Sequence, residues 1–250
     1  MTLLAAPAKL TWYLEVTGRR SNGLHELRAE MVTVDFADEL EIDDGADYLR
    51  VEGPFPSVST GPDNLVAGAL RLVGRRAGVK LRKVIPPGGG LGGGSADAAA
   101  VLRWAGGVTN ERALSLGADV PFCQLGGRAL VEGVGERLTP LSYEARDLTL
   151  VLLPFGLDTA SVYRAYDERG DEGRPAGARN DLEGAARRVE PRLARAMDWL
   201  SATLGVPVHL AGSGSTLFVE GHLRVGAPPW DVEGPDGSVH FRQTTTTPRV

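Results

Sequence analysis

The segment 86–100 contains the residue types that could act on a phosphorylated ligand. After Pro86, its glycines are Gly88, Gly89, Gly90, Gly92, Gly93 and Gly94, and only Leu91 interrupts them. Residues without a Cβ atom reach positive φ easily and let a ligand approach their N–H groups. Ser95 is a good helix N-cap, and the Ala-rich run behind it favours a helix. Because free N–H donors and a helix dipole both favour an anion, this segment predicts a phosphate-binding loop.

The glycine run has three other possible interpretations. A flexible linker is the simplest, but Leu91 interrupts the glycines and a helix former follows directly, which favours a binding loop. A Walker A loop is excluded because no Gly-Lys-Ser/Thr ends the run. A dinucleotide fingerprint is excluded because no acidic residue ends a second strand about 20 residues further on. The loop therefore predicts phosphate binding without fixing the reaction.

Asp119 is the second candidate for chemistry, because it lies in the apolar stretch from Leu116 to Phe122. Gly117 is expected to end a helix, and Pro121 to block its continuation. An unpaired buried carboxylate is costly, so Asp119 must be paired, capping or functional, and its position alone favours capping or pairing. A second glycine–serine turn, 211–216, either joins a tight hairpin or lines the same anion site.

The composition limits the class of protein. With 250 residues and 42% hydrophobic residues, the chain can form one large or two small domains. Its net charge of −5 argues against a nucleic-acid coat or a membrane-surface protein, although not against a local basic pocket. The lone Cys123 excludes an internal disulfide and indicates a reducing, cytoplasmic compartment. No apolar run is long enough for a membrane span, and the first residues lack the basic region of a signal peptide.

The elements that must position these residues follow from the hydrophobic patterns. Strands are expected at 10–16, 31–42, 79–86 and 127–133, a polar hairpin loop at 17–25, helices at 65–77 and 111–116, and a turn at 135–141. A boundary near 142–146 predicts two domains, 1–145 and 146–250. The second domain is expected to contain strands at 148–154, 206–210, 217–220 and 239–243, a helix at 158–169, a loop at 170–177, and one or two helices within 180–204. The Thr-rich end of the chain is expected to be disordered.

Three segments in order resemble the three motifs of the GHMP kinase superfamily: residues 7–10, the glycine loop, and residues 211–215. Further segments are similar to one branch of it, the kinases that phosphorylate the 2-hydroxyl of a cytidine diphosphate-linked alcohol in isoprenoid (terpenoid) biosynthesis. They are 18–26, 63–65, 116–122 and 132–136, so the resemblance covers residues 5–141 almost continuously and the C-terminal half more thinly.

The resemblance implies a role for each candidate residue. Asp119 would be the general base and Lys9 its charge-stabilising partner, while the glycine loop, including Pro86 and Ser95, would bind the phosphates of ATP with Mg²⁺, whose ligands stay unknown. Asn64 would lie on the nucleotide side. The residues expected to bind the substrate are Thr11, His25, Thr159, Tyr163, Gly212 and Ser213. Among them, His25 would read the cytosine and Tyr163 would stack on it.

The resemblance also implies an α/β fold in two subdomains, a ribosomal-protein-S5-like N-terminal part and a smaller α+β C-terminal part, with the active site between them. The expected partner is a small cytidine diphosphate substrate, without nucleic acid or membrane, and the expected state is a monomer or weak homodimer. The sequence departs from the family pattern at Thr11, Leu24 and Ala96, where Asn, Tyr and Ser are usual. Another GHMP kinase, of homoserine or mevalonate type, and a catalytically weakened nucleotide-binding homologue therefore stay open as alternatives.

Overall fold

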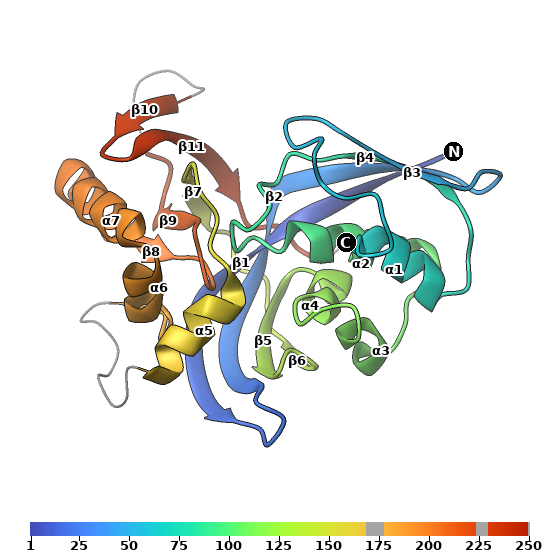
Figure 1. The fold of residues 1–250 in the computed structure, drawn as a ribbon, viewed down its shortest axis with the longest axis horizontal. Helices are drawn as coiled ribbons and strands as arrows, with labels where there is room; N and C mark the ends of the chain where they lie inside the picture. The colour runs from blue at the N-terminus through green and yellow to red at the C-terminus, as the bar shows by residue number, and fades with distance from the viewer. Residues whose placement is uncertain (169–177, 224–229, 250) are drawn as a thin grey trace.

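A computed structural model describes residues 1–168, 178–223 and 230–249 (Figure 1). The architecture is mixed α/β, as predicted, with two separate sheets that carry helices. The chain leaves the first sheet after residue 140 and enters the second at residue 147. The domain division at 145/146 stays a prediction. No helix in the described ranges is long and apolar enough to cross a membrane.

The first sheet is organised around a long antiparallel hairpin of β1 (Thr2–Arg19) and β2 (His25–Asp43). One part of β2 pairs with β4 (Gly78–Arg82), which in turn pairs with β3 (Tyr48–Glu52). Another part of β2 pairs with β5 (Arg128–Gly133), which in turn pairs with β6 (Arg137–Pro140). The strands expected at 10–16 and 31–42 are confirmed as parts of longer ones. The prediction missed β3, and it was wrong to give 135–141 as a turn only, because β6 lies within that range.

Helices α1 (Leu65–Leu72), α2 (Gly93–Trp104), α3 (Asn110–Leu114) and α4 (Val120–Leu125) accompany this sheet (Figure 1). Three predictions here were wrong in detail. Helix α1 ends before residue 77, because the chain turns at Gly74 with φ +65°. The N-cap of α2 is Gly92, not Ser95, which lies in the first turn. Pro121 does not block a helix but lies in the first turn of α4, where a missing N–H costs nothing.

The second sheet has five strands. In sheet order they are β10 (Trp230–Gly234), β11 (Gly237–Thr245), β7 (Asp147–Leu152), β9 (Leu217–Glu220) and β8 (His209–Leu210). Helices α5 (Thr159–Glu168), α6 (Glu183–Val189) and α7 (Pro191–Leu204) lie beside it (Figure 1). The predicted break of the long helical stretch at Pro191 is confirmed. The loop predicted at 170–177 falls outside the described residues.

The Thr-rich end is ordered through residue 246, contrary to the prediction of a disordered tail. Residues 33–38 of β2 lie between the segments that pair with β4 and β5, and the end of the chain meets β2 there. Thr246 forms a β-bridge with Val34, and the N–H of Thr247 donates to the carbonyl of Thr33 at 2.9 Å. Composition does not indicate this order. Threonine has a high strand propensity, and these hydrogen bonds satisfy backbone N–H and C=O groups of β2.

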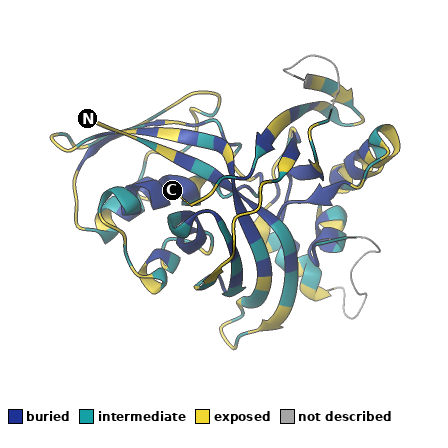
Figure 2. Ribbon diagram, turned by 180° about the vertical axis from the view of Figure 1, so that it is seen from behind, coloured by how far each residue is buried: buried dark blue, intermediate teal, exposed yellow. Residues whose placement is uncertain are grey.

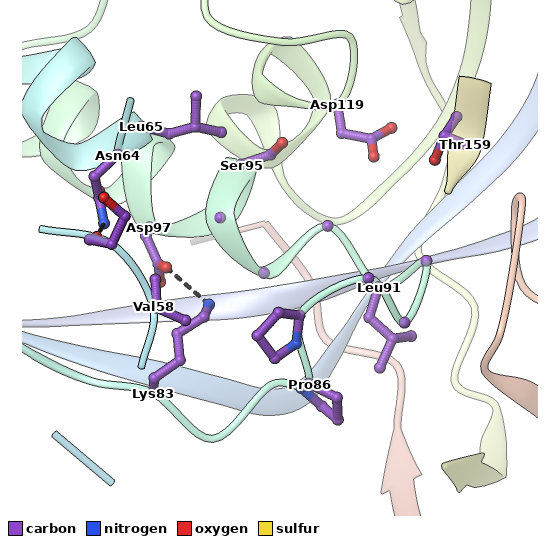
Figure 3. A pocket seen from close by; sticks show the side chains of 18 of the residues that line it. Val58, Asn64, Leu65, Lys83, Pro86, Leu91, Ser95, Asp97, Asp119 and Thr159 are labelled. Carbon is purple, nitrogen blue, oxygen red and sulfur yellow. Dashed lines mark hydrogen bonds and ion pairs between the residues drawn. The ribbon is translucent and has the colours of Figure 1, made fainter. Parts of the chain in front are cut away.

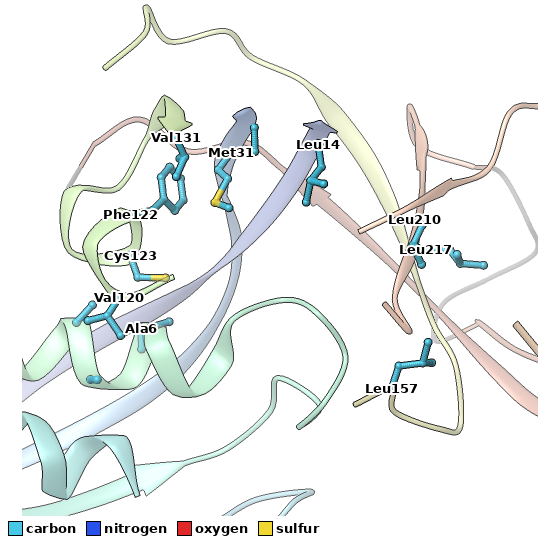
Figure 4. Close-up of a cluster of buried hydrophobic side chains, with 14 of the residues drawn as sticks. Ala6, Leu14, Met31, Val120, Phe122, Cys123, Val131, Leu157, Leu210 and Leu217 are labelled. Atoms are coloured by element: carbon cyan, nitrogen blue, oxygen red, sulfur yellow. The ribbon is translucent and has the colours of Figure 1, made fainter. Parts of the chain in front are cut away.

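The hydrophobic core extends through both parts of the molecule, and Figure 2 shows that the strands in the middle of the molecule are mostly buried. Phe122 and Cys123 of α4 lie close to Met31 and Val131 of the first sheet (Figure 4). The same cluster of buried apolar side chains extends to Leu157, Leu210 and Leu217 of the second part. Cys123 is 5% exposed and packs as a small hydrophobic residue, and burial raises the pKa of its thiol.

Candidate active site

The glycine loop is anchored to the first sheet at both of its ends. Strand β4 stops at Arg82 rather than continuing to Pro86 as predicted, because the Asp38 carboxylate accepts the N–H groups of Val84 and Ile85 at 2.5 and 2.8 Å. Further on, the N–H of Lys9 donates to the carbonyl of Leu91 at 3.0 Å. The loop between these anchors therefore has a fixed position relative to β1.

The second glycine–serine turn, 211–216, packs directly against the glycine loop. It joins the antiparallel β8–β9 pair, so the hairpin interpretation is correct. The N–H of Thr216 also donates to the carbonyl of Gly89 at 3.0 Å. Gly90 has φ +77°, and a Cβ atom there would lie 2.5 Å from the carbonyl oxygen of Ala211. Only glycine fits this contact, so the two glycine segments form one backbone unit.

A cavity of about 520 Å³ opens above the glycine loop. Its wall includes all the residues predicted for the nucleotide, namely Asn64, Pro86, Gly88, Gly89, Gly90, Leu91, Gly92, Gly93, Gly94 and Ser95. Asn64 and Leu65 lie at one end of the cavity, Asp119 and Thr159 at the other, and Ser95 between them (Figure 3). Asn64 also caps α1, since its Oδ1 accepts the N–H of Val66 at 2.8 Å.

Lys9 and Asp119, predicted from distant parts of the sequence, face each other at this second end. Lys9 Nζ lies 3.3 Å from Asp119 Oδ2, and the Lys9 side chain is 6% exposed against 30% for Asp119. The carboxylate makes no cap hydrogen bond to α4, so pairing rather than capping accounts for it. Lys9 Nζ also donates to Thr11 Oγ1 at 3.2 Å, and a Cβ atom on Gly212 would lie 3.3 Å from Nζ. The ammonium therefore contacts Asp119 and Thr11 and lies beside Gly212 of the second glycine–serine turn.

Beneath the loop lies a buried ionic cluster that sequence reasoning missed. Lys83 Nζ contacts Asp38 Oδ2 and lies 2.8 Å from Asp97 Oδ2, and all three residues are at most 3% exposed. Lys83 precedes the loop and Asp97 follows it in α2, so their contact joins the two ends of the loop. Burial raises the pKa of the Asp97 carboxyl to about 7; Asp38 reinforces the shift and Lys83 opposes it. Its Oδ1 atom is buried without a hydrogen-bond partner among the described residues.

A second cavity of about 670 Å³ adjoins the first, and Thr159 lines both. Its wall includes His25 and Tyr163, two of the predicted substrate residues. The two rings stack on each other, with centroids 4.7 Å apart. The Thr159 hydroxyl shares a 2.8 Å hydrogen bond with the hydroxyl of Ser213. His25, Tyr163, Thr159 and Ser213 are therefore brought together at the second cavity, whereas Thr11 and Gly212 lie beside Lys9. Stacking of Tyr163 on a base stays a prediction.

Two signals in the sequence could have indicated the missed residues. Asp97 is the only charged residue in the apolar first half of the helix after the loop, and Lys83 stands directly before the loop. Among the described residues, no group of three or more His, Cys, Asp or Glu side chains is arranged to hold a metal ion. The oxygen donors that line the cavity include the hydroxyls of Ser59, Ser95 and Thr159 and the carboxylates of Asp63, Asp97 and Asp119. They suit a hard cation such as Mg²⁺ that takes its other ligands from phosphate and water.

Comparison with known proteins agrees with this geometry. Residues 64–127 match the model of the GHMP kinases N-terminal domain. The chain is 38% identical to the 4-diphosphocytidyl-2-C-methyl-D-erythritol kinase of Paracoccus denitrificans over 86% of this chain and 85% of the relative. It is 34% identical to the enzyme of the same name from Delftia acidovorans over 85% and 84%.

Solved structures point the same way. A crystal structure of 4-(cytidine 5'-diphospho)-2C-methyl-D-erythritol kinase superposes with a TM-score of 0.72 at 31% identity, covering 98% of this chain and 100% of that one. A mevalonate kinase superposes with a TM-score of 0.60 at 13% identity, covering 99% and 100%. The second likeness supports the fold alone and confirms the predicted GHMP kinase architecture.

Proposed function

The chain belongs to the family of 4-diphosphocytidyl-2-C-methyl-D-erythritol kinases, and we propose that it transfers the γ-phosphoryl group of ATP to the 2-hydroxyl of that cytidyl alcohol. The product would feed the non-mevalonate synthesis of isoprenoid precursors. A cytoplasmic location and a monomeric or weakly dimeric state remain predictions.

The observation that carries the assignment of roles is the 3.3 Å separation between Lys9 Nζ and Asp119 Oδ2 where the two cavities adjoin. Phosphoryl transfer depends mainly on positioning and on charge stabilisation. In this proposal Asp119 accepts the proton of the substrate hydroxyl, and Lys9 pairs with that carboxylate and stabilises the developing alkoxide. Thr11 supports this because its hydroxyl accepts a hydrogen bond from the ammonium, and Gly212 leaves room beside it, since a Cβ atom there would lie 3.3 Å from Nζ.

The first cavity would hold ATP. Backbone N–H groups of the glycine loop and the N-terminus of α2 would bind its phosphates, because donors and dipole both favour an anion there. The base would lie toward Asn64 and Leu65, at the end far from Asp119 (Figure 3). Mg²⁺ would neutralise phosphate charge, with the Ser95 hydroxyl as the protein ligand we propose. The second cavity would hold the cytidyl group beside His25 and Tyr163, with Thr159 and Ser213 between base and reacting hydroxyl.

The test is a kinase assay on a panel of acceptors with Asp119→Asn as the critical variant. ATP consumption is expected with the cytidyl alcohol and not with homoserine or mevalonate. Asp119→Asn should lower kcat by at least about 10²-fold at nearly unchanged ATP affinity, as expected for loss of a general base. Glu111→Gln is the matched control, because it makes the same type of change on the exposed surface of α3.

Two outcomes would reject the proposal in different ways. Turnover of homoserine or mevalonate in place of the cytidyl alcohol would reject the substrate, whereas an unchanged kcat in Asp119→Asn would remove Asp119 from the mechanism. Tight ATP binding without turnover of any acceptor would identify the chain as a nucleotide-binding homologue that has lost catalysis.

A further inference from the structure

Asp167, near the C-terminal end of α5, connects the second cavity to the hairpin of β1 and β2. Its Oδ1 lies 2.6 Å from Nε2 of His25, and its Oδ2 lies 3.2 Å from Nη1 of Arg19. All three residues line the second cavity. The carboxylate therefore reaches across 142 positions of sequence to the ring that is expected to read the base.

The His25 ring has little freedom in this arrangement. Its side chain is 10% exposed, Tyr163 stacks on it with centroids 4.7 Å apart, and Tyr166 meets it edge-on at 6.2 Å. The Asp167 carboxylate is hydrogen-bonded to Nε2, and no described residue forms a hydrogen bond with Nδ1. A carboxylate at one ring nitrogen fixes which nitrogen carries the proton. In the neutral ring Nε2–H then donates to Asp167, and Nδ1 presents a lone pair.

A fixed lone pair distinguishes the two pyrimidines of ordinary nucleotides. Cytosine carries an amino donor at position 4, whereas the corresponding atom of thymine or uracil is an oxygen acceptor. A lone pair on Nδ1 can accept from the amino group but would face the oxygen of uracil unfavourably. Sites that hydrogen-bond a substrate group discriminate strongly against an analogue that cannot make the bond.

We propose that Asp167 is a positioning residue that sets the proton on His25 Nε2 and thereby gives the second cavity its preference for cytosine over uracil. The inference rests on the proposed function, since it requires that this cavity binds the cytidyl group. Arg19 assists by occupying the other carboxylate oxygen, so that Asp167 keeps its orientation.

A purely structural role predicts something different. In that case Asp167 would only join α5 to the hairpin, and its loss would weaken binding of every ligand of the cavity equally. The Asp167 side chain is 31% exposed and that of Arg19 56%, and ion pairs with this exposure contribute little to stability. The preference between two pyrimidines therefore separates the two roles, because general loosening does not change it.

The experiment compares wild type, Asp167→Asn, Asp167→Glu and the control Glu168→Gln, which changes the next carboxylate of α5. Binding of CDP and UDP is measured by calorimetry, and kcat/KM is measured with the cytidyl substrate and its uridine counterpart. Asparagine can present either an oxygen or an N–H to Nε2, so it no longer fixes the proton. The CDP-over-UDP ratio is expected to fall about tenfold in Asp167→Asn, the worth of one hydrogen bond between neutral groups. Asp167→Glu should recover part of the ratio, and Glu168→Gln should leave it unchanged.

Equal weakening of CDP and UDP in Asp167→Asn would overturn the inference. A wild-type enzyme that phosphorylates the cytidyl substrate yet binds CDP and UDP equally would also overturn it, while leaving the proposed function intact. Absence of any turnover of the cytidyl substrate by wild type would instead overturn the proposed function.

Discussion

The buried cluster of Lys83, Asp38 and Asp97 should make the stability of the protein depend on pH in a specific direction. When Asp97 is ionised, two carboxylates share one ammonium in a site that is at most 3% exposed. The Asp38 carboxylate accepts hydrogen bonds from Lys83 Nζ and from two backbone N–H groups. Asp97 is the member with an unpartnered oxygen, so its ionisation is the costly one.

The sign follows from the raised pKa. In the unfolded chain the Asp97 carboxyl titrates near 3.8, whereas burial raises its pKa to about 7 in the folded protein. Between these values the native state binds more protons than the unfolded state. This contribution to stability is therefore fully present below about pH 4 and is lost as pH rises through about 7. At about 1.4 kcal/mol for each unit of pKa, the loss is at most about 4 kcal/mol.

Asp97→Asn keeps the shape of the side chain and an acceptor oxygen for Lys83 but removes the second negative charge. We expect the variant to gain stability over wild type as the pH rises from 5 to 8.5, by up to about 3 kcal/mol, because about two units of the pKa shift lie above pH 5. Urea unfolding followed by circular dichroism at several pH values between 5 and 8.5 measures this difference. Because all other titrating groups are shared, the difference between the two curves isolates Asp97.

Asp38→Asn is the matched control, since it makes the same change in the same cluster. It removes the carboxylate that holds Lys83 and the N–H groups of Val84 and Ile85, so it should destabilise the protein at every pH, by about 1–3 kcal/mol. If wild type and Asp97→Asn kept a constant difference in stability between pH 5 and 8.5, the Asp97 carboxyl would already be ionised in the folded protein at pH 5, and the reasoning would be refuted.

Two further outcomes are expected. Gly90→Ala should weaken ATP binding and lower the melting temperature, because its Cβ atom would lie 2.5 Å from the carbonyl oxygen of Ala211. The control Gly74→Ala has φ +65° and no atom within 4 Å of its Cβ atom, so it should lower the free energy of unfolding by only about 1–2 kcal/mol through left-handed strain. Equal losses of unfolding free energy in the two variants would argue against the clash. Cys123, whose thiol is buried with a raised pKa, should resist thiol reagents in the native protein and react fully in denaturant, and rapid labelling of the folded protein would contradict this.

The sequence predicted the parts of the site whose residue types leave few alternatives. Six glycines before a helix former indicated a phosphate loop without any family knowledge, and all six line the first cavity. The roles of Lys9 and Asp119 came from the resemblance, and their distance of 3.3 Å agrees with it. From the residues alone, Asp119 could only be said to need a partner, because its environment in the fold was not yet known.

The sequence could not predict contacts that depend on the register of distant strands. Lys83 and Asp38 are 45 positions apart, and nothing local to either marks the other as its partner. His25 and Asp167 are further apart still. The prediction for the end of the chain was wrong for another reason. A run of threonines lacks the apolar residues that indicate burial, yet Thr244 and Thr246 are at most 4% exposed beside β2.

The departures from the family pattern affect the rim of the site more than its chemistry. Thr11 replaces an asparagine, but its hydroxyl still accepts a hydrogen bond from Lys9 Nζ at 3.2 Å, so the ammonium keeps a neutral partner. Ala96 replaces a serine at a position that is 1% exposed, where packing of α2 rather than contact with ligand decides the residue. Leu24 replaces a tyrosine and is 52% exposed at the second cavity. Weaker binding of the cytidyl group is therefore the expected consequence of these changes. It should raise KM for that substrate while kcat, which in our proposal depends on Lys9 and Asp119, is maintained.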